Sequence, residues 1–266
     1  MRLLHQAVVC AIILVLASPA FAIPLGTNIT INDGVTGTSS TWYGNAANTS
    51  TGSEDDEVEP GCITGQAWDL EAFFLDGYTL SLVGGFDFVS GNGGYRSGDI
   101  FININGDAHY GPGTGGGSGN TTVTNTFGYD YVLDLDFQSK SYTVYRLVEG
   151  VSTLTVFYSQ NDESNPWRYN AGGEAVTSGN FTYLSGLPGE EVGGLSGQAH
   201  NLARFDLGFL RDVDGFEGTF LAHFTIECGN DNLMGRGTAP VPEPATLLLL
   251  GTGLLGLAGL GRKKTR

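Results

Sequence analysis

Short runs of apolar residues recur along the interior of the chain, and several of them alternate with polar residues. They cover residues 67–74, 79–89, 99–105, 129–138, 141–149, 152–158, 202–210 and 218–228. Most are rich in β-branched or aromatic side chains and are bounded by Gly, Asn or Asp, which is typical of strands. We therefore predict about eight strands and no long helix in the interior.

The clearest alternation lies in residues 129–138. Positions 131, 133, 135 and 137 are apolar or aromatic, whereas Asp130, Asp134 and Asp136 point to the other face of a strand. An antiparallel strand with one polar face must bury its apolar face against another layer. The expected fold is an all-β, antiparallel two-sheet sandwich or jelly roll that occupies residues 61–237.

The N-terminus has the features of a secretory signal peptide, residues 1–22. Arg2 is followed by an apolar stretch from Ala7 to Ala17, and the small residues Ala20 and Ala22 fit a cleavage site after Ala22. We expect the export translocon and signal peptidase to act here. The mature chain would begin with an irregular acidic segment, residues 23–60.

The C-terminal segment, residues 238–266, has a different pattern. It is uncharged from 245 to 261, a length at the lower limit for a transmembrane helix. A basic tail follows, which would stay on the cytoplasmic side of the membrane. The basic residues are Arg262, Lys263, Lys264 and Arg266.

Pro242, Glu243 and Pro244 lie immediately before this apolar segment. Two prolines around an acid disfavour a helix and favour an extended segment that an enzyme can bind. Together with the apolar helix and the basic tail, this Pro-Glu-Pro sequence resembles the PEP-CTERM sorting signal. The resemblance implies a Gram-negative host, recognition by an exosortase-type membrane protease, and removal or exchange of a transient anchor. A permanent membrane anchor is the alternative.

The charge balance excludes one class of partner. The chain has 28 acidic and 12 basic residues, and five of the basic residues belong to the two terminal segments. A nucleic acid partner is therefore not expected. The acids either form a solvated coat or collect divalent cations.

Two cysteines, Cys62 and Cys228, remain after removal of the signal peptide. In an oxidising compartment they are expected to form a disulfide, and two free thiols are the alternative.

The sequence contains no recognisable catalytic motif, and any metal ligands are unknown. Calcium is the one candidate cofactor, and the side chains that would form a site between strands are Asp99, Asn103, Asn105, Asp107, Asn230 and Asp231. Aromatic side chains could instead bind sugars or fill the core. The candidates are Trp42, Trp68, Trp167, Tyr169 and Tyr183.

Three further segments carry a second resemblance, which covers most of the interior. Residues 68–73, 98–102 and 223–232 resemble a β-sandwich ectodomain that recurs in PEP-CTERM proteins. The first of these segments is also similar to the opening of family-9 carbohydrate-binding modules and DOMON-like sandwiches. This resemblance implies the fold and leaves the ligand open.

The leading functional expectation is an exported, non-enzymatic protein of the cell surface or extracellular matrix. It would act structurally in a biofilm or exopolysaccharide layer, with exopolysaccharide as a candidate partner. A carbohydrate- or calcium-binding module is the alternative, and a secreted hydrolase ranks last.

Overall fold

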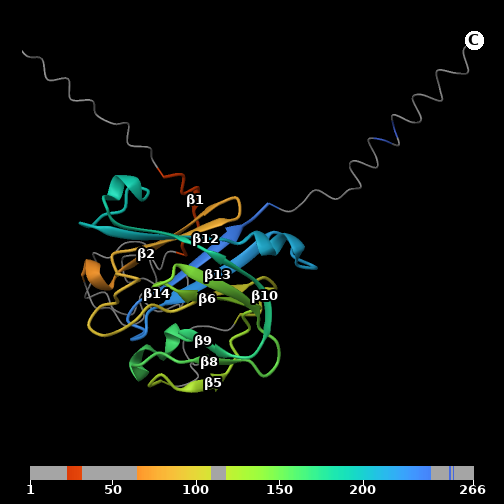
Figure 1. Cartoon of the computed structure of the whole chain (residues 1–266), viewed down its shortest axis with the longest axis horizontal. Helices are drawn as coiled ribbons and strands as arrows, with labels where there is room; N and C mark the ends of the chain where they lie inside the picture. The colour runs from red at the N-terminus through yellow and green to blue at the C-terminus, as the bar shows by residue number, and fades with distance from the viewer. Residues whose placement is uncertain (1–22, 32–64, 109–117, 241–251, 253, 255–266) are drawn as a thin grey trace, which may run out of the picture.

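A computed structural model describes residues 23–31, 65–108, 118–240, 252 and 254. Between residues 23 and 240 the described chain is all-β, with three antiparallel sheets arranged as layers and with helices that are all short and of the 3-10 type (Figure 1). The predicted signal peptide, residues 32–60 and nearly all of the C-terminal apolar segment lie outside the described residues.

The first layer is a five-stranded sheet. Its order is β1 (Thr27–Asn28), β2 (Leu70–Asp76), β3 (Thr79–Gly84), β12 (His200–Asp206) and β11 (Thr182–Leu187).

The middle layer has six strands. Its order is β10 (Glu174–Asn180), β7 (Ser141–Arg146), β6 (Tyr131–Asp136), β4 (Ile100–Asn103), β13 (Thr219–Thr225) and β14 (Asn232–Thr238). The third layer contains β5 (Thr122–Thr124), β8 (Ser152–Leu154) and β9 (Arg168–Ala171). The 3-10 helices are η2 (Gln66–Trp68), η3 (Ser159–Ser164), η4 (Gly189–Glu191) and η5 (Gly208–Asp212).

The main core lies between the five-stranded and six-stranded sheets. Leu80 and Leu82 of β3 and Leu133 and Leu135 of β6 are buried in the same cluster. Alternate residues of a strand point to one face, so each strand contributes every second side chain to this core. The predicted alternation of β6 is confirmed, because Tyr131, Leu133 and Leu135 all lie in this cluster.

A second core lies on the other face of the six-stranded sheet. Phe101 and Val132 pack there with Phe127 and Tyr129, and Val123 and Tyr169 of the three-stranded sheet contact this cluster. The all-β antiparallel sandwich is confirmed, but the structure adds a third sheet that was not predicted. Because strands of the middle sheet bury both faces, Phe101 and Val132 are apolar where strict alternation would require polar residues.

Within the described residues, no helix combines the length and the apolar composition needed to cross a membrane. The segment predicted to do so, residues 245–261, lies almost wholly outside them, so this span stays a prediction.

Candidate functional site

A cluster of oxygen atoms surrounds the side chain of Asn103, the last residue of β4, which is only 2% exposed. Its Nδ2 atom lies 2.8 Å from Asn105 Oδ1, 3.0 Å from Asp107 Oδ1, 2.8 Å from the Gly128 carbonyl and 3.2 Å from Asp130 Oδ2. An amide nitrogen carries two hydrogens. Four oxygen acceptors therefore converge on a group that can satisfy two.

Backbone amides fix the shape of this loop. Gly106 N donates to Asn103 Oδ1 at 2.9 Å, and Ile104 N donates to Asp130 Oδ2 at 2.7 Å. Burial raises the pKa of Asp130, and the charge of Asp107 raises it further. Two carboxylates thus lie close together in a partly buried loop, an arrangement that a cation would stabilise.

The structure brings together three of the six side chains predicted for calcium: Asn103, Asn105 and Asp107. Asp99, Asn230 and Asp231 lie elsewhere, and Asp231 Oδ2 accepts a hydrogen bond from Leu70 N at 2.6 Å. Sequence reasoning missed Asp130 and the Gly128 carbonyl because they come from the segment that enters β6. In the described part of the chain, no group of three His, Cys, Asp or Glu side chains is placed to hold a metal.

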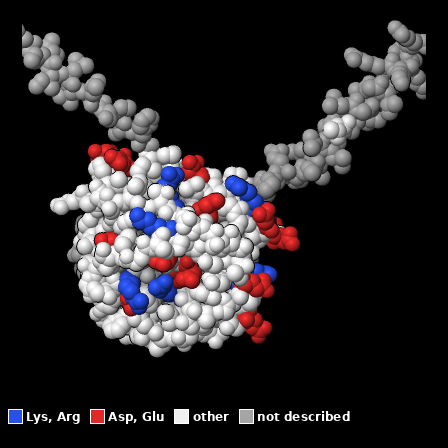
Figure 2. Space-filling view, viewed as in Figure 1, with Lys and Arg blue, Asp and Glu red and all other residues white. Residues whose placement is uncertain are grey.

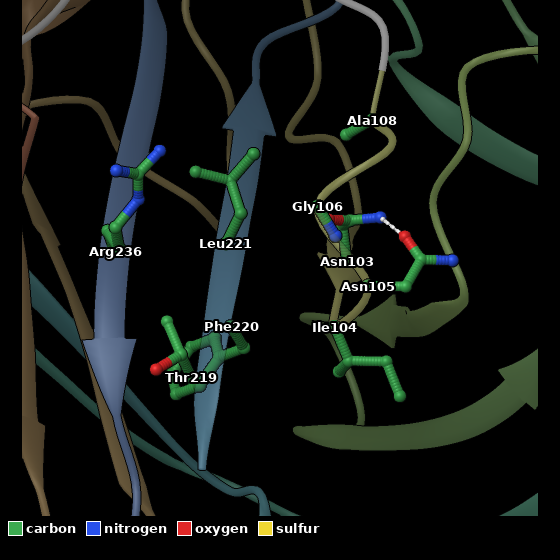
Figure 3. Close-up of a pocket in the computed structure, with 9 residues that line it drawn as sticks. All are labelled: Asn103, Ile104, Asn105, Gly106, Ala108, Thr219, Phe220, Leu221 and Arg236. Atoms are coloured by element: carbon green, nitrogen blue, oxygen red, sulfur yellow. Dashed lines mark hydrogen bonds between the residues drawn. The ribbon is translucent and has the colours of Figure 1, made fainter. Parts of the chain in front are cut away.

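An open groove of about 340 Å³ lies beside this cluster (Figure 3). Asn103 and Asn105 line one side of it, and Thr219, Leu221 and Arg236 come from β13 and β14. On the face shown in Figure 2, basic side chains are few and are interspersed with acidic ones. That face offers no continuous basic surface for an anionic polymer.

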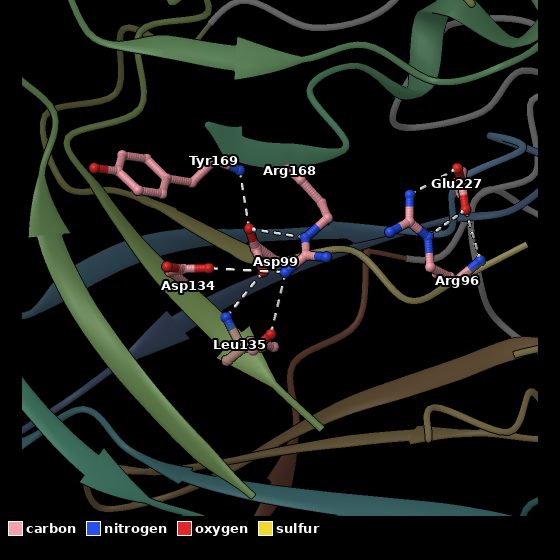
Figure 4. A network of polar contacts seen from close by, with 7 residues as sticks. All are labelled: Arg96, Asp99, Asp134, Leu135, Arg168, Tyr169 and Glu227. Carbon is pink, nitrogen blue, oxygen red and sulfur yellow. Dashed lines mark hydrogen bonds and ion pairs between the residues drawn. The ribbon is translucent and has the colours of Figure 1, made fainter. Parts of the chain in front are cut away.

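The calcium candidate Asp99 belongs to a buried polar network (Figure 4). Its carboxylate is fully buried and accepts hydrogen bonds from Leu135 N and Tyr169 N, each at 2.9 Å. Arg168 Nε lies 3.6 Å away, and the Arg168 guanidinium also lies 3.8 Å from Asp134. Burial raises the pKa of Asp99 to about 7, whereas Arg168 opposes that rise. The network joins β6 and β9, so it connects the middle and third sheets.

A second ion pair lies beside it. Arg96 Nε and Nη2 donate to the two Glu227 carboxylate oxygens at 3.0 and 3.1 Å, and Asn120 Nδ2 donates to Glu227 at 2.7 Å. The Arg96 and Arg168 guanidinium carbons lie 5.2 and 5.8 Å from the ring centre of Trp167, which is fully buried. These contacts are typical of structural ties between loops and sheets.

The aromatic residues considered for sugar binding do not form a common flat surface. Trp167 is inside the core, and Tyr183 packs edge-on against Phe88. Trp68 is tilted by 53° relative to Tyr95, and Tyr169 stacks on Tyr145. Trp42 lies outside the described residues. Sugar binding therefore stays a prediction without support from these rings.

Two histidines, His200 and His223, are fully buried. His223 packs against Tyr129 and Phe101, and burial lowers its pKa to about 4, so it is neutral at physiological pH. His200 Nδ1 lies 2.7 Å from Glu71 Oε2, and both side chains are inaccessible to solvent. No spacing in the sequence indicates the contact between His200 and Glu71, because Glu71 lies on β2 and His200 lies on β12.

Cys228 is a buried, free thiol among the described residues, and burial raises its pKa to about 11. Cys62 lies outside the described residues, so the predicted Cys62–Cys228 disulfide stays a prediction. The signal-cleavage residues Ala20 and Ala22 also lie outside.

The fold ends directly before the proposed sorting segment. After β14, Ala239 N donates to the Gly218 carbonyl at 2.7 Å. Residues 240–263 match the family model of the PEP-CTERM protein-sorting motif. The match includes Pro242, Glu243, Pro244, Arg262 and Lys263, which confirms the resemblance seen in the sequence and is consistent with an exosortase substrate. Comparisons with curated proteins and with solved structures found no match.

Proposed function

We propose that this chain is an exported, non-enzymatic protein that an exosortase-type membrane enzyme sorts to the cell surface or extracellular matrix of a Gram-negative bacterium. Its three-layered β domain would be the displayed part and would act structurally in an exopolysaccharide or biofilm layer. In this proposal signal peptidase cuts after Ala22, and residues 245–261 hold the chain in the inner membrane until it is processed.

One observation carries the proposal: the sorting motif begins at residue 240, where the described β domain ends. The whole sandwich therefore precedes the motif, as expected for cargo. A compact antiparallel domain with a strongly acidic composition is also typical of a protein that must stay soluble outside the cell.

The test is intact mass and cell fractionation in the native host, with and without the sorting enzyme. We expect a form that begins at Ile23 and lacks residues 262–266 only when the enzyme is present, recovered with the surface or matrix. A chain that keeps residues 262–266 in the inner membrane of both strains would contradict sorting and support a permanent anchor.

The oxygen cluster around Asn103 favours a second candidate function, calcium binding by the displayed domain. Calcium binds six to eight oxygen ligands at about 2.3–2.6 Å, including carboxylates, amide oxygens and backbone carbonyls. A cation among Asn105 Oδ1, Asp107 Oδ1, the Gly128 carbonyl and Asp130 Oδ2 would replace the Asn103 Nδ2 group at their centre. The bound ion would tie the loop after β4 to the start of β6.

Thermal unfolding of the full chain in detergent, with calcium or with a chelator, tests this candidate. Calcium should raise the unfolding temperature of the wild type, and Asp130→Asn should greatly reduce that rise because one anionic ligand is lost. Glu190→Gln, an exposed acid on η4, is the matched control and should keep it. An equal rise in all three proteins would rule out binding at this cluster.

A further inference from the structure

A cavity of about 740 Å³ opens where β6 begins and β7 ends. Its lining comes from the segments 104–105, 130–131, 146–149 and 213–217. Leu147 N donates to the Asp130 carbonyl at 2.8 Å, and Tyr131 pairs with Arg146, so backbone contacts fix one wall. Cavities of roughly 300–1,000 Å³ are typical of small-molecule sites. This space, which we name the Tyr131 cavity, therefore has the size of a ligand site.

Tyr131, the first residue of β6, lines this cavity although it is only 6% exposed. Its ring packs against Phe209, with 5.2 Å between the ring centres, so the position of the phenol is fixed by the core. Among the described residues, no group is hydrogen-bonded to the Tyr131 hydroxyl. A buried tyrosine hydroxyl usually has a hydrogen-bond partner. This hydroxyl is therefore available to a molecule that enters the cavity.

The charged side chains around this hydroxyl are mostly acidic. The acids that line the cavity are Asp130, Glu149, Asp214 and Glu217. Arg146 also lines it, but its guanidinium lies 3.7 Å from Glu174 and is thereby partly neutralised. Burial raises the pKa of Tyr131, Arg146 opposes that rise and the charge of Asp130 adds to it, so both charged groups lie near the phenol. The cavity therefore attracts cations and repels anions.

The combination of these groups narrows the class of ligand. An apolar molecule would leave the Tyr131 hydroxyl and the carboxylates without partners. A protonated polyamine carries donors alone, so it offers no acceptor to the phenol O–H. A sugar that carries a protonated amine satisfies both kinds of group. Its oxygen atoms can accept from Tyr131, and its ammonium can donate charge-assisted hydrogen bonds to the carboxylates.

We propose that the Tyr131 cavity binds a sugar that carries a protonated amine, as one unit of a cationic polysaccharide. The Tyr131 hydroxyl donates to an oxygen atom of the sugar, and the acids of the cavity, Asp130 and Glu217 among them, attract its ammonium group. This inference extends the proposed function, because it gives the displayed domain a matrix component to bind. It requires no calcium at the cluster around Asn103.

The test is isothermal titration calorimetry of the full chain in detergent at about pH 6, with a chelator present to exclude calcium. The probe is the tetrasaccharide of glucosamine, and the matched ligand is the tetrasaccharide of N-acetylglucosamine, which lacks the charge. We expect the acetylated sugar to bind about ten- to a hundredfold more weakly, the factor that corresponds to one hydrogen bond to a charged group. Equal binding of the two sugars would overturn the inference.

Two substitutions locate the binding in this cavity. Tyr131→Phe removes the hydroxyl and keeps the ring, and it should weaken binding of the glucosamine tetrasaccharide about two- to tenfold, as expected for one neutral hydrogen bond. Tyr142→Phe is the matched control, because it removes the hydroxyl of another buried tyrosine outside the cavity. Glu217→Gln should weaken binding about tenfold, whereas Glu190→Gln, an exposed acid on η4, should match the wild type.

Spermine separates a built site from general attraction of cations to an acidic protein. It carries amines and no hydroxyl groups, so Tyr131→Phe should leave its binding unchanged. Glu217 is exposed, so Glu217→Gln keeps the test valid if Tyr131→Phe lowers the unfolding temperature. Wild-type affinity for the glucosamine tetrasaccharide in both variants would overturn the inference. The same holds if the wild type does not bind it, and neither result affects sorting, which the fractionation experiment measures separately.

Discussion

At the scale of single residues, Asp99 is the clearest source of pH dependence. It is fully buried, and its pKa of about 7 exceeds that of an aspartate in an unfolded chain, about 3.8. An acid that holds its proton more tightly when folded favours folding below the pKa of the unfolded chain. This contribution is lost as the pH rises through about 7. We predict that wild type loses stability relative to Asp99→Asn between pH 5 and pH 8.

The measurement is the free energy of unfolding in urea at several pH values for both proteins. The difference between their profiles isolates Asp99, because the buried His223 contributes equally to both. Asp136→Asn is a useful control, since a hydrogen bond from Ser139 lowers the pKa of the exposed Asp136 carboxyl. Its difference profile should be flat from pH 5 to pH 8. A flat profile for Asp99→Asn as well would show that Arg168 keeps Asp99 ionised.

How far single residues could be predicted depended on their separation along the chain. Asn103, Asn105 and Asp107 are two residues apart, and the sequence placed them in one candidate site. Asp130 completes the cluster from the segment before β6, and only strand pairing brings it there. Asp99 was grouped with the wrong partners, because the position of Arg168 against it depends on the third sheet.

At the scale of elements, the apolar strands were predicted and the polar edge strands were missed. β10 and β11 are mostly exposed and rich in Thr, Ser and Gly, so neither has an apolar face that would produce alternation. β14 contains Gly235 and Gly237, which the sequence alone does not favour as a strand. Packing explains why glycine stands at position 237, because a Cβ atom there would lie only 2.6 Å from the Phe220 ring.

Two ion pairs between elements should differ strongly in their contribution to stability. The side chain of Glu227 is 8% exposed and accepts hydrogen bonds from Arg96 and Asn120. In the second pair, Arg146 Nη1 lies 3.7 Å from Glu174 Oε2, and both side chains are largely exposed. We predict that Glu227→Ala lowers the free energy of unfolding by about 2 kcal/mol. Glu174→Ala should lower it by less than about 0.5 kcal/mol.

Urea unfolding of both variants at two salt concentrations provides the comparison. Salt should reduce the small effect at Glu174 and change the larger one at Glu227 little, because burial limits screening. Equal losses for the two variants would mean that the tie between the Arg96 loop and the end of β13 contributes no more than a surface pair.

At the scale of the whole molecule, β14 joins the two ends of the described domain. It pairs with β13 on one side, and on the other Ile31 N donates to the Met234 carbonyl and Arg236 N to the Ile29 carbonyl. Leu233 and Met234 are fully buried. In Figure 1 β14 lies beside β13, and it is the edge strand of the middle sheet. β14 is therefore part of the core, although it directly precedes the sorting motif.

This position predicts where the chain can be shortened. A chain that ends at Pro240 should unfold at the same temperature as the full chain, because every contact described above involves residues up to 240. A chain that ends at Asp231 loses two buried apolar side chains, worth about 1.5–3 kcal/mol each, together with a full strand of hydrogen bonds. The loss of these side chains and hydrogen bonds approaches the whole free energy of unfolding of a typical domain, about 5–15 kcal/mol. Near-ultraviolet circular dichroism should then show native packing in the chain that ends at Pro240 and no native packing in the chain that ends at Asp231. A marked loss of stability in the chain that ends at Pro240 would mean that the sorting segment belongs to the fold.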